Sequence, residues 1–167
     1  MDRFSANLEY PEIKVASLDI VFAKKLLVPY ASKESEMTAT AEYGYRAVIL
    51  AKTDPPLSKV MSGIGRVEMT HLNILAKLIY ALGYDPKYRV VENTIPVFWN
   101  AENVNYKKDA ESVLKAAISD EENACKYYLS LSRQTKDPNV SRILTRLAAD
   151  EKLHAQILGE ELKKRQK

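Results

Sequence analysis

The chain has 167 residues, of which 46% are hydrophobic and 28% are charged, with 5 Gly and 7 Pro. This composition is typical of one folded domain with a substantial core, and it excludes a disordered or collagen-like chain. With 25 Lys and Arg against 22 Asp and Glu, the net charge of +3 is too small and too evenly spread to predict nucleic acid or a membrane surface as a partner.

Apolar residues recur at spacings of three and four along most of the chain, whereas β-type alternation is rare, so the sequence predicts an all-α protein. A short apolar helix is expected over Ser17–Leu27, ending near Pro29 and packing across the other helices. A first long helix is then expected over about 31–52.

Asp54 followed by Pro55 is typical of a helix N-cap and first turn. A second long helix is therefore expected from there to about Leu82, where Gly83 supplies a left-handed C-cap. Residues 84–106 lose the helical pattern and contain prolines and scattered aromatic residues. We expect this stretch to be a long crossover that packs onto the helices.

A third long helix is expected over about 107–135, and Asp137-Pro138 repeats the cap and proline start for a fourth helix that runs to about Lys164. The sequence therefore predicts a four-helix bundle of two hairpins, with one long crossover between the second and third helices and a short extra N-terminal helix. The expected organisation is an N-terminal segment with the short helix at 1–30 and the bundle domain at 31–167.

The only two histidines of the chain each follow a glutamate by three residues, giving Glu68-x-x-His71 and Glu151-x-x-His154. In both motifs the glutamate lies 14 positions after the aspartate of the predicted N-cap, so the motifs lie at the same depth of their helices. Residues three apart share one face of a helix, and here that face is the apolar one. Each motif can therefore offer a carboxylate and an imidazole to one buried metal ion.

The other two long helices contain a matching phrase, Glu-x-x-Ala-x-x-x-Tyr, at Glu36, Ala39 and Tyr43 and at Glu121, Ala124 and Tyr128. Its residues lie in line with apolar residues, so we predict that Glu36 and Glu121 point inward. Glu34 and Glu122, which share a face with more Lys and Ser, are the alternatives. Four buried glutamates without partners would cost several kcal/mol each, and two divalent cations cancel their charge.

These residues resemble the ferritin-like superfamily of di-iron and di-manganese carboxylate proteins, which includes rubrerythrins, bacterioferritins and manganese catalases. The resemblance covers about residues 31–164 and implies a cofactor of two Fe or two Mn ions per chain. It implies Glu36 and Glu121 as terminal ligands, Glu68 and Glu151 as bridging ligands, and His71 and His154 as the nitrogen ligands. It also implies that Tyr43 donates to the carboxylate of Glu121, with Tyr128 as its pseudo-symmetric partner.

The function implied by this resemblance is an oxidoreductase that acts on hydrogen peroxide, either a rubrerythrin-like peroxidase or a manganese-catalase-like enzyme. Rubrerythrins carry a further glutamate where this chain has Ala124, and they usually append a four-cysteine rubredoxin unit that is absent here, so a peroxidase would need an external electron donor. One alternative is an iron-handling ferritin-like protein that oxidises Fe²⁺ with O₂. Another is a structural coat-type protein with a metal staple.

The single cysteine, Cys125, excludes an internal disulfide and a cysteine-rich zinc or iron site, so any metal must be held by oxygen and nitrogen. Residues 1–14 lack the apolar stretch of a secretory signal, and no apolar run approaches the roughly 20 residues that span a bilayer. We therefore expect a cytoplasmic protein. Because the chain stops soon after His154, without the fifth helix common in cage-forming ferritins, we expect a homo-oligomer that is a dimer or otherwise small.

Overall fold

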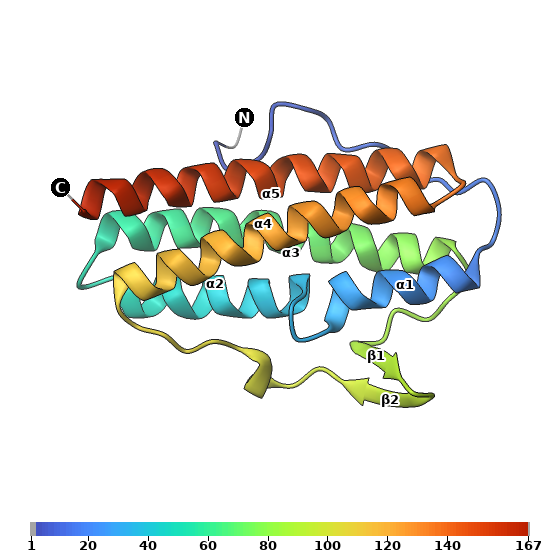
Figure 1. Ribbon diagram of the computed structural model, residues 1–167, viewed down its shortest axis with the longest axis horizontal. Coiled ribbons are helices and arrows are strands. Elements are labelled where there is room, and N and C mark those ends of the chain that lie inside the picture. The colour runs from blue at the N-terminus through green and yellow to red at the C-terminus, as the bar shows by residue number, and fades with distance from the viewer. Residues whose placement is uncertain (1–2, 167) are drawn as a thin grey trace.

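The computed structural model describes residues 3–166, which are mostly helical (Figure 1). The helices of this part of the chain are α1 (Ile20–Ala31), α2 (Glu36–Leu50), α3 (Pro55–Ala81), α4 (Ala110–Gln134) and α5 (Pro138–Arg165). Helix α2 packs mainly on α3, and α4 packs mainly on α5. The predicted all-α bundle of two antiparallel hairpins is confirmed.

The helix starts inferred from the sequence are formed as expected. The carboxylate of Asp54 accepts a hydrogen bond from the backbone N–H of Leu57 at 3.1 Å, and that of Asp137 accepts one from Asn139 at 2.8 Å. These caps satisfy N–H groups that have no partner inside the helix. At the end of α3, Gly83 has a φ of +92°, the left-handed conformation that glycine adopts at low cost.

Helix α1 corrects the prediction for the N-terminal helix. It begins at Ile20 and continues through Pro29 to Ala31, rather than ending before the proline. A proline so close to the end removes only one backbone hydrogen bond, and the buried side chains of Tyr30 and Ala31 hold the last turn in the core. Helix α1 also does not cross the bundle.

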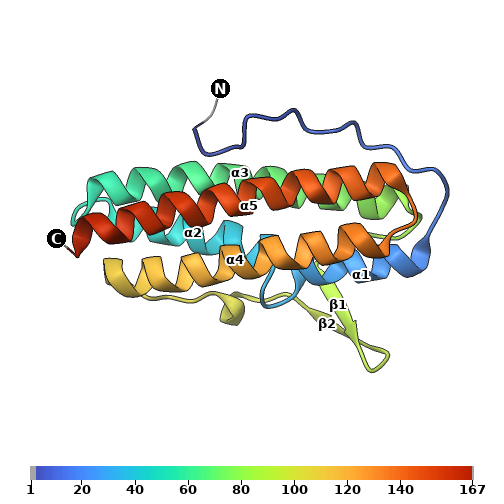
Figure 2. The same ribbon diagram turned by 45° about the horizontal axis from the view of Figure 1, so that its top comes forward.

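Instead, α1 lies end to end with α2 along α3 (Figures 1 and 2). The 12 residues of α1 and the 15 of α2 together match the 27 of α3. Helix α1 contributes to the same apolar cluster as α3 and α5. The division into an N-terminal segment at 1–30 and a bundle domain at 31–167 stays a prediction.

The crossover contains a hairpin that the sequence analysis did not predict. Strand β1 (Arg89–Glu92) pairs antiparallel with β2 (Ile95–Phe98), and a short 3₁₀ turn follows at Ala101–Asn103. The two turn residues, Asn93 and Thr94, have φ values of 48° and 70°, as the favoured two-residue hairpin turn requires. Asn93 was the available signal, but Pro96 and the short strands obscured it.

Two polar contacts fasten the crossover to α2. The indole N–H of Trp99 donates to the hydroxyl of Thr38 at 2.8 Å, and the backbone N–H of Asn105 donates to the carboxylate of Glu42 at 2.7 Å. The expectation that this stretch packs onto the helices is therefore met. The crossover covers the side of the bundle where α2 faces α4 (Figure 2).

The core of the described chain consists of two apolar clusters, one toward each end of the bundle. Between them lies a layer of buried charged residues. The apolar clusters are bounded by Val67 and Leu72 on α3, by Ala117 and Tyr128 on α4, and by Ala148 and Leu158 on α5. The side chains that interrupt the core at this level are those of the candidate site.

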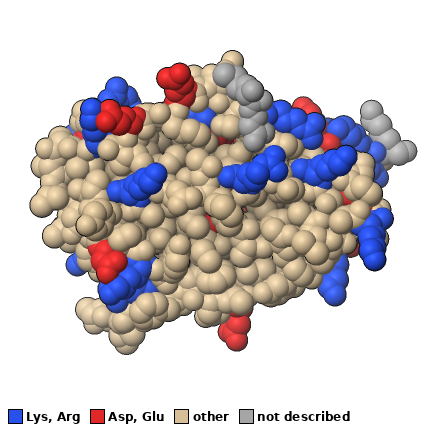
Figure 3. Space-filling model, turned by 180° about the vertical axis from the view of Figure 1, so that it is seen from behind, with Lys and Arg blue, Asp and Glu red and all other residues tan. Residues whose placement is uncertain are grey.

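None of the described helices is long and apolar enough to cross a membrane. On the face shown in Figure 3, most Lys and Arg side chains are separated by uncharged surface.

Candidate metal centre

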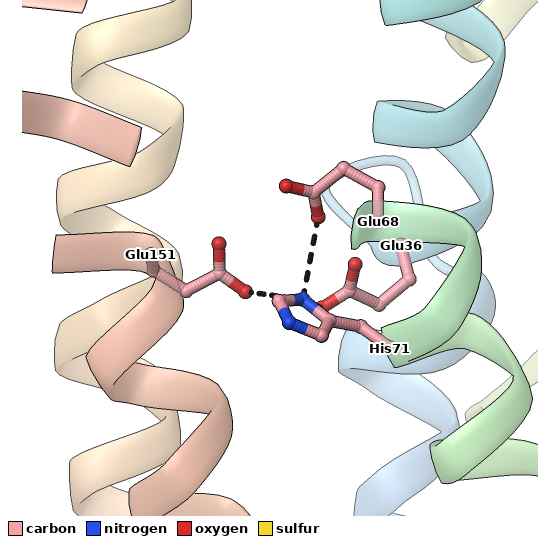
Figure 4. Close-up of side chains that lie close together, drawn as sticks. All are labelled: Glu36, Glu68, His71 and Glu151. Atoms are coloured by element: carbon pink, nitrogen blue, oxygen red, sulfur yellow. Dashed lines mark ion pairs between the residues drawn. The ribbon is translucent and has the colours of Figure 1, made fainter. Parts of the chain in front are cut away.

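The structure brings together the six side chains that the sequence analysis selected from four different helices. Glu36 lies on α2, Glu68 and His71 on α3, Glu121 on α4, and Glu151 and His154 on α5. All six are buried, with exposed fractions of 4% or less. Figure 4 shows Glu151 reaching across from α5 toward His71, with Glu36 and Glu68 on the opposite side.

Within residues 3–166 these side chains form two overlapping groups of possible metal ligands. One group contains Glu36, Glu68, His71 and Glu151, and the other contains Glu68, Glu121, Glu151 and His154. In each group the ligand atoms lie within 4.8 Å of one another. Glu68 and Glu151 belong to both groups, which is the arrangement that two neighbouring cations with shared carboxylates require.

The same ring nitrogen of each histidine faces the carboxylates. Nδ1 of His71 lies 3.0 Å from Oε1 of Glu151 and 3.5 Å from Oε2 of Glu68. Nδ1 of His154 lies 2.8 Å from Oε1 of Glu68 and 3.4 Å from Oε2 of Glu121.

The other ring nitrogen of each histidine is held by a hydrogen-bond acceptor. Nε2 of His71 lies 2.9 Å from Oδ2 of Asp150, and Nε2 of His154 lies 2.8 Å from the backbone oxygen of Phe4. A carboxylate and a carbonyl can only accept, so Nε2 donates its proton in both rings and Nδ1 is the ring atom that faces the carboxylates. A metal ligand needs this orientation, with Nδ1 free of its own proton.

The sequence analysis missed Asp150 and Arg146, which are buried on α5. The guanidinium of Arg146 lies 2.7 Å from Oδ1 of Asp150. Their four-residue spacing was the available signal, but such pairs are common on helix surfaces and here the burial depends on residues 3–10 covering them. Asp150 also accepts hydrogen bonds from the hydroxyl of Tyr10 and from the backbone N–H of Ala6, at 2.7 and 2.6 Å.

The buried atoms at the centre of the cluster fit bound cations. Apart from the contacts between Nδ1 and the carboxylates, six of them have no hydrogen-bond partner: Oε2 of Glu36, Oε1 of Glu68, both carboxylate oxygens of Glu151, and Nδ1 of His71 and of His154. Carboxylates and imidazoles that face one another in the protein interior cost free energy unless protons or cations lie between them. A divalent cation in each ligand group would satisfy them and offset the carboxylate charge.

In the absence of a cation, protons occupy part of the cluster. Burial, followed by the charge of Glu68, raises the pKa of Glu36 and Glu121 well above the usual range. Burial lowers the pKa of His71 and His154, but the surrounding carboxylates outweigh it and raise both pKa values well above the usual range. Metal ions must therefore compete with protons for these ligand atoms.

Each tyrosine named by the sequence analysis donates to a carboxylate of the cluster. The hydroxyl of Tyr43 donates to Glu121, and that of Tyr128 donates to Glu36. Burial and the neighbouring carboxylate raise the pKa of both hydroxyls well above the usual range, so both stay protonated donors. The two contacts are related by the pseudo-symmetry of the hairpins.

The alternatives Glu34 and Glu122 are exposed. The structure thus places Glu36 and Glu121, and not these neighbours, in the cluster. A cavity of about 560 Å³ connects the cluster to the side of the bundle under the crossover. Its lining contains four cluster carboxylates together with the exposed Glu34 and Glu92 and the buried Arg46. Small solutes can therefore reach the carboxylates from this side.

The bundle with its buried carboxylate and histidine layer defines a ferritin-like fold with a candidate dinuclear metal centre. The rubrerythrin family model matches residues 112–167, which contain most of α4 and all of α5. No curated protein matches the chain in sequence.

Among solved structures, the chain is similar to KatB, a manganese catalase from Anabaena PCC7120, with a TM-score of 0.85 and 20% identity over 96% of this chain and 80% of that chain. A second structure, of wild-type KatB from Anabaena, has a TM-score of 0.83 and 20% identity over 95% of this chain and 79% of the other. These similarities show that the chain shares the fold of the two manganese catalase structures.

Proposed function

We propose that this chain binds two iron or manganese ions and acts as an oxidoreductase on hydrogen peroxide. The observation that carries the proposal is the pair of overlapping ligand groups, which share Glu68 and Glu151 and line a cavity that reaches the surface. Glu36 and His71 would complete one metal position, and Glu121 and His154 the other. Oxygen-rich ligands with one imidazole per metal suit both iron and manganese.

The bound metal pair would supply a two-electron redox change at neighbouring open coordination positions. The chain supplies the setting. Tyr43 and Tyr128 hold Glu121 and Glu36 in orientation by hydrogen bonds, and the protonated Nε2 atoms fix the two imidazoles. The apolar clusters on either side of the layer separate it from solvent at the two ends of the bundle.

The comparisons support peroxide as the substrate, because the two similar structures are those of a manganese catalase and the matching family model is that of rubrerythrin. A catalase-type reaction converts two peroxide molecules to two water molecules and O₂, and it needs no other reductant. A peroxidase-type reaction reduces peroxide to water and takes two electrons from an external donor.

The test is peroxide consumption by metal-loaded protein, with and without a reductant. Two Mn per chain with O₂ evolution would identify the catalase-type reaction, and two Fe per chain with peroxide loss only when a donor is added would identify the peroxidase type. The variant Glu121→Gln should abolish turnover, whereas Glu122→Gln changes the exposed neighbour and should keep it. Metal-replete wild-type protein that leaves peroxide untouched under both conditions contradicts the proposal.

Iron handling is the second candidate, and the acidic lining of the cavity favours it. Carboxylates line the cavity from the exposed Glu34 and Glu92 inward to the cluster, as an entry route for divalent cations would require. In that case Fe²⁺ would be the substrate and O₂ the oxidant. Rapid Fe²⁺ oxidation by O₂ without peroxide turnover would favour it, and light scattering would show whether the chain forms a shell or the small homo-oligomer that we propose. A cytoplasmic location likewise stays a proposal.

A further inference from the structure

The N-terminal arm, residues 3–10, lies along the outside of α3 and α5 (Figures 1 and 2). Arg146 binds it through two main-chain oxygens, with Nε 2.8 Å from the oxygen of Leu8 and a terminal nitrogen 3.1 Å from that of Ala6. The guanidinium also lies 4.2 Å from the ring centre of Tyr10. The arm is therefore bound to the bundle by buried polar groups rather than by surface contacts alone.

Within the described residues, only one of the two histidine side chains of the candidate metal centre is hydrogen-bonded to the arm. His71 has its acceptor, Asp150, on α5 and thus within the bundle. His154 has no such acceptor on a helix, because its Nε2 is held by the backbone oxygen of Phe4 in the arm. The orientation of His154 consequently depends on where Phe4 lies.

Phe4 is fixed by a recess in α3 that a glycine creates. The ring of Phe4 is 5% exposed and belongs to the apolar cluster of α2, α3 and α4. A Cβ atom added at Gly63 would lie 2.1 Å from Cε2 of this ring, so any larger residue would displace it. Glycine within a helix is less stable than alanine, and the packing of Phe4 gives a physical reason for its presence here.

We propose that the arm is a positioning element for His154, and that Phe4 in the Gly63 recess keeps the metal position of Glu121 and His154 occupied. This inference rests on the proposed metal centre. When Phe4 leaves the recess, Nε2 of His154 loses its acceptor and the ring loses its fixed orientation, while His71 keeps Asp150. The loss of metal should therefore be selective for one of the two positions.

The test compares two glycine-to-alanine variants after loading with Mn²⁺. Gly63→Ala displaces Phe4, whereas Gly159→Ala on α5 adds its methyl group where nothing lies within 4 Å. Both substitutions increase helix propensity to a similar extent. A difference in metal release between the two variants therefore comes from the displacement of Phe4. Metal content per chain and the time course of Mn²⁺ release to EDTA are measured on untagged protein.

The wild type and Gly159→Ala should each hold two Mn²⁺ per chain, and the release rates of Gly159→Ala should equal those of the wild type. Gly63→Ala should release one of its two ions at least about tenfold faster than the other. The inference would be overturned if Gly63→Ala released both ions at the wild-type rates, or if both ions were released faster by the same factor. Either result would leave the proposed metal centre intact. A wild-type chain that binds no Mn²⁺ would instead contradict the proposed function.

A spectroscopic measurement separates positioning from general destabilisation. Because the chain has only two histidines, ¹⁵N-histidine labelling of the zinc-loaded protein gives two ring systems. In Gly63→Ala the Nε2–H proton of His154 should exchange rapidly with water, and that of His71 should be unchanged. If Gly63→Ala does not fold, Phe4→Ala removes the same contact from the other side, and the same selective changes are expected; unchanged exchange at His154 would contradict the inference.

Discussion

Nε2 of His71 lies 2.9 Å from Oδ2 of Asp150, the residue directly before the shared carboxylate Glu151. One turn of α5 thus provides both a carboxylate for the centre and the group that orients an imidazole of the opposite hairpin. The two helix pairs are coupled through this contact. Any change in the position of Asp150 therefore affects ligands on α3 and α5 together.

Replacing Asp150 by Asn should weaken Mn²⁺ binding by about 10- to 100-fold, because a neutral amide replaces the charged carboxylate that orients His71. The same change leaves the buried Arg146 without its ion pair and should lower the free energy of unfolding by about 3 kcal/mol. Calorimetric titration and urea unfolding measure the two effects. Asp85→Asn is the control, because it changes an exposed aspartate that pairs with Lys87, and it should change neither quantity measurably.

The pKa shifts predict that metal binding strengthens as the pH rises. In the metal-free protein the raised pKa values of His71, His154, Glu36 and Glu121 favour the protonated form of each group. A cation must displace these protons, so its affinity falls below neutral pH and protons are released on binding. Calorimetry in two buffers of different ionisation enthalpy measures the release. An affinity independent of pH between 5 and 8 would contradict this view of the cluster.

Removing either tyrosine hydroxyl should affect the centre without emptying it. Tyr43→Phe and Tyr128→Phe leave the carboxylates of Glu121 and Glu36 in place but delete the donor to each. We expect two metals per chain, a stability loss of about 1 kcal/mol, and peroxide turnover reduced at least about tenfold. Tyr127→Phe alters a more exposed tyrosine next to Tyr128 and should behave as wild type. Unchanged turnover in both test variants would show that the hydrogen bonds from the two hydroxyls are not needed for activity.

Metal loading should stabilise the fold whatever the catalytic outcome. At 100 times the dissociation constant, each Mn²⁺ contributes about 2.7 kcal/mol to the free energy of unfolding, because the unfolded chain has no preformed site. The double variant Glu68→Ala with His154→Ala should lose this metal-dependent gain. If the gain occurs but no turnover is found with any substrate, the centre acts as a structural staple.

The helical hairpins and the six cluster residues could be predicted from the sequence because each is marked by a pattern among residues close together in the chain. Asp-Pro caps set the starts of α3 and α5, and a three-residue spacing on an apolar face marked each Glu and His pair. The pseudo-repeat then selected Glu36 and Glu121 over their exposed neighbours. Their role as ligands stays a prediction that metal binding must test.

The features that the sequence did not predict depend on contacts between distant segments. Residues 3–10 have no helical or alternating pattern, and their importance comes from where Arg146 and Asp150 hold them. The continuation of α1 past Pro29 likewise depends on the burial of Tyr30 against other helices. Local preferences contain no information about such packing.

The most direct test of the shared-carboxylate centre is a titration of metal-free, untagged protein with Mn²⁺, followed by elemental analysis and electron paramagnetic resonance. The arrangement of Glu68 and Glu151 predicts two Mn²⁺ per chain and a spectrum altered by magnetic coupling between neighbouring ions. The variant Glu68→Gln should lose that coupling. One ion per chain, no bound ion, or two ions with the spectrum of isolated Mn²⁺ would contradict a dinuclear centre.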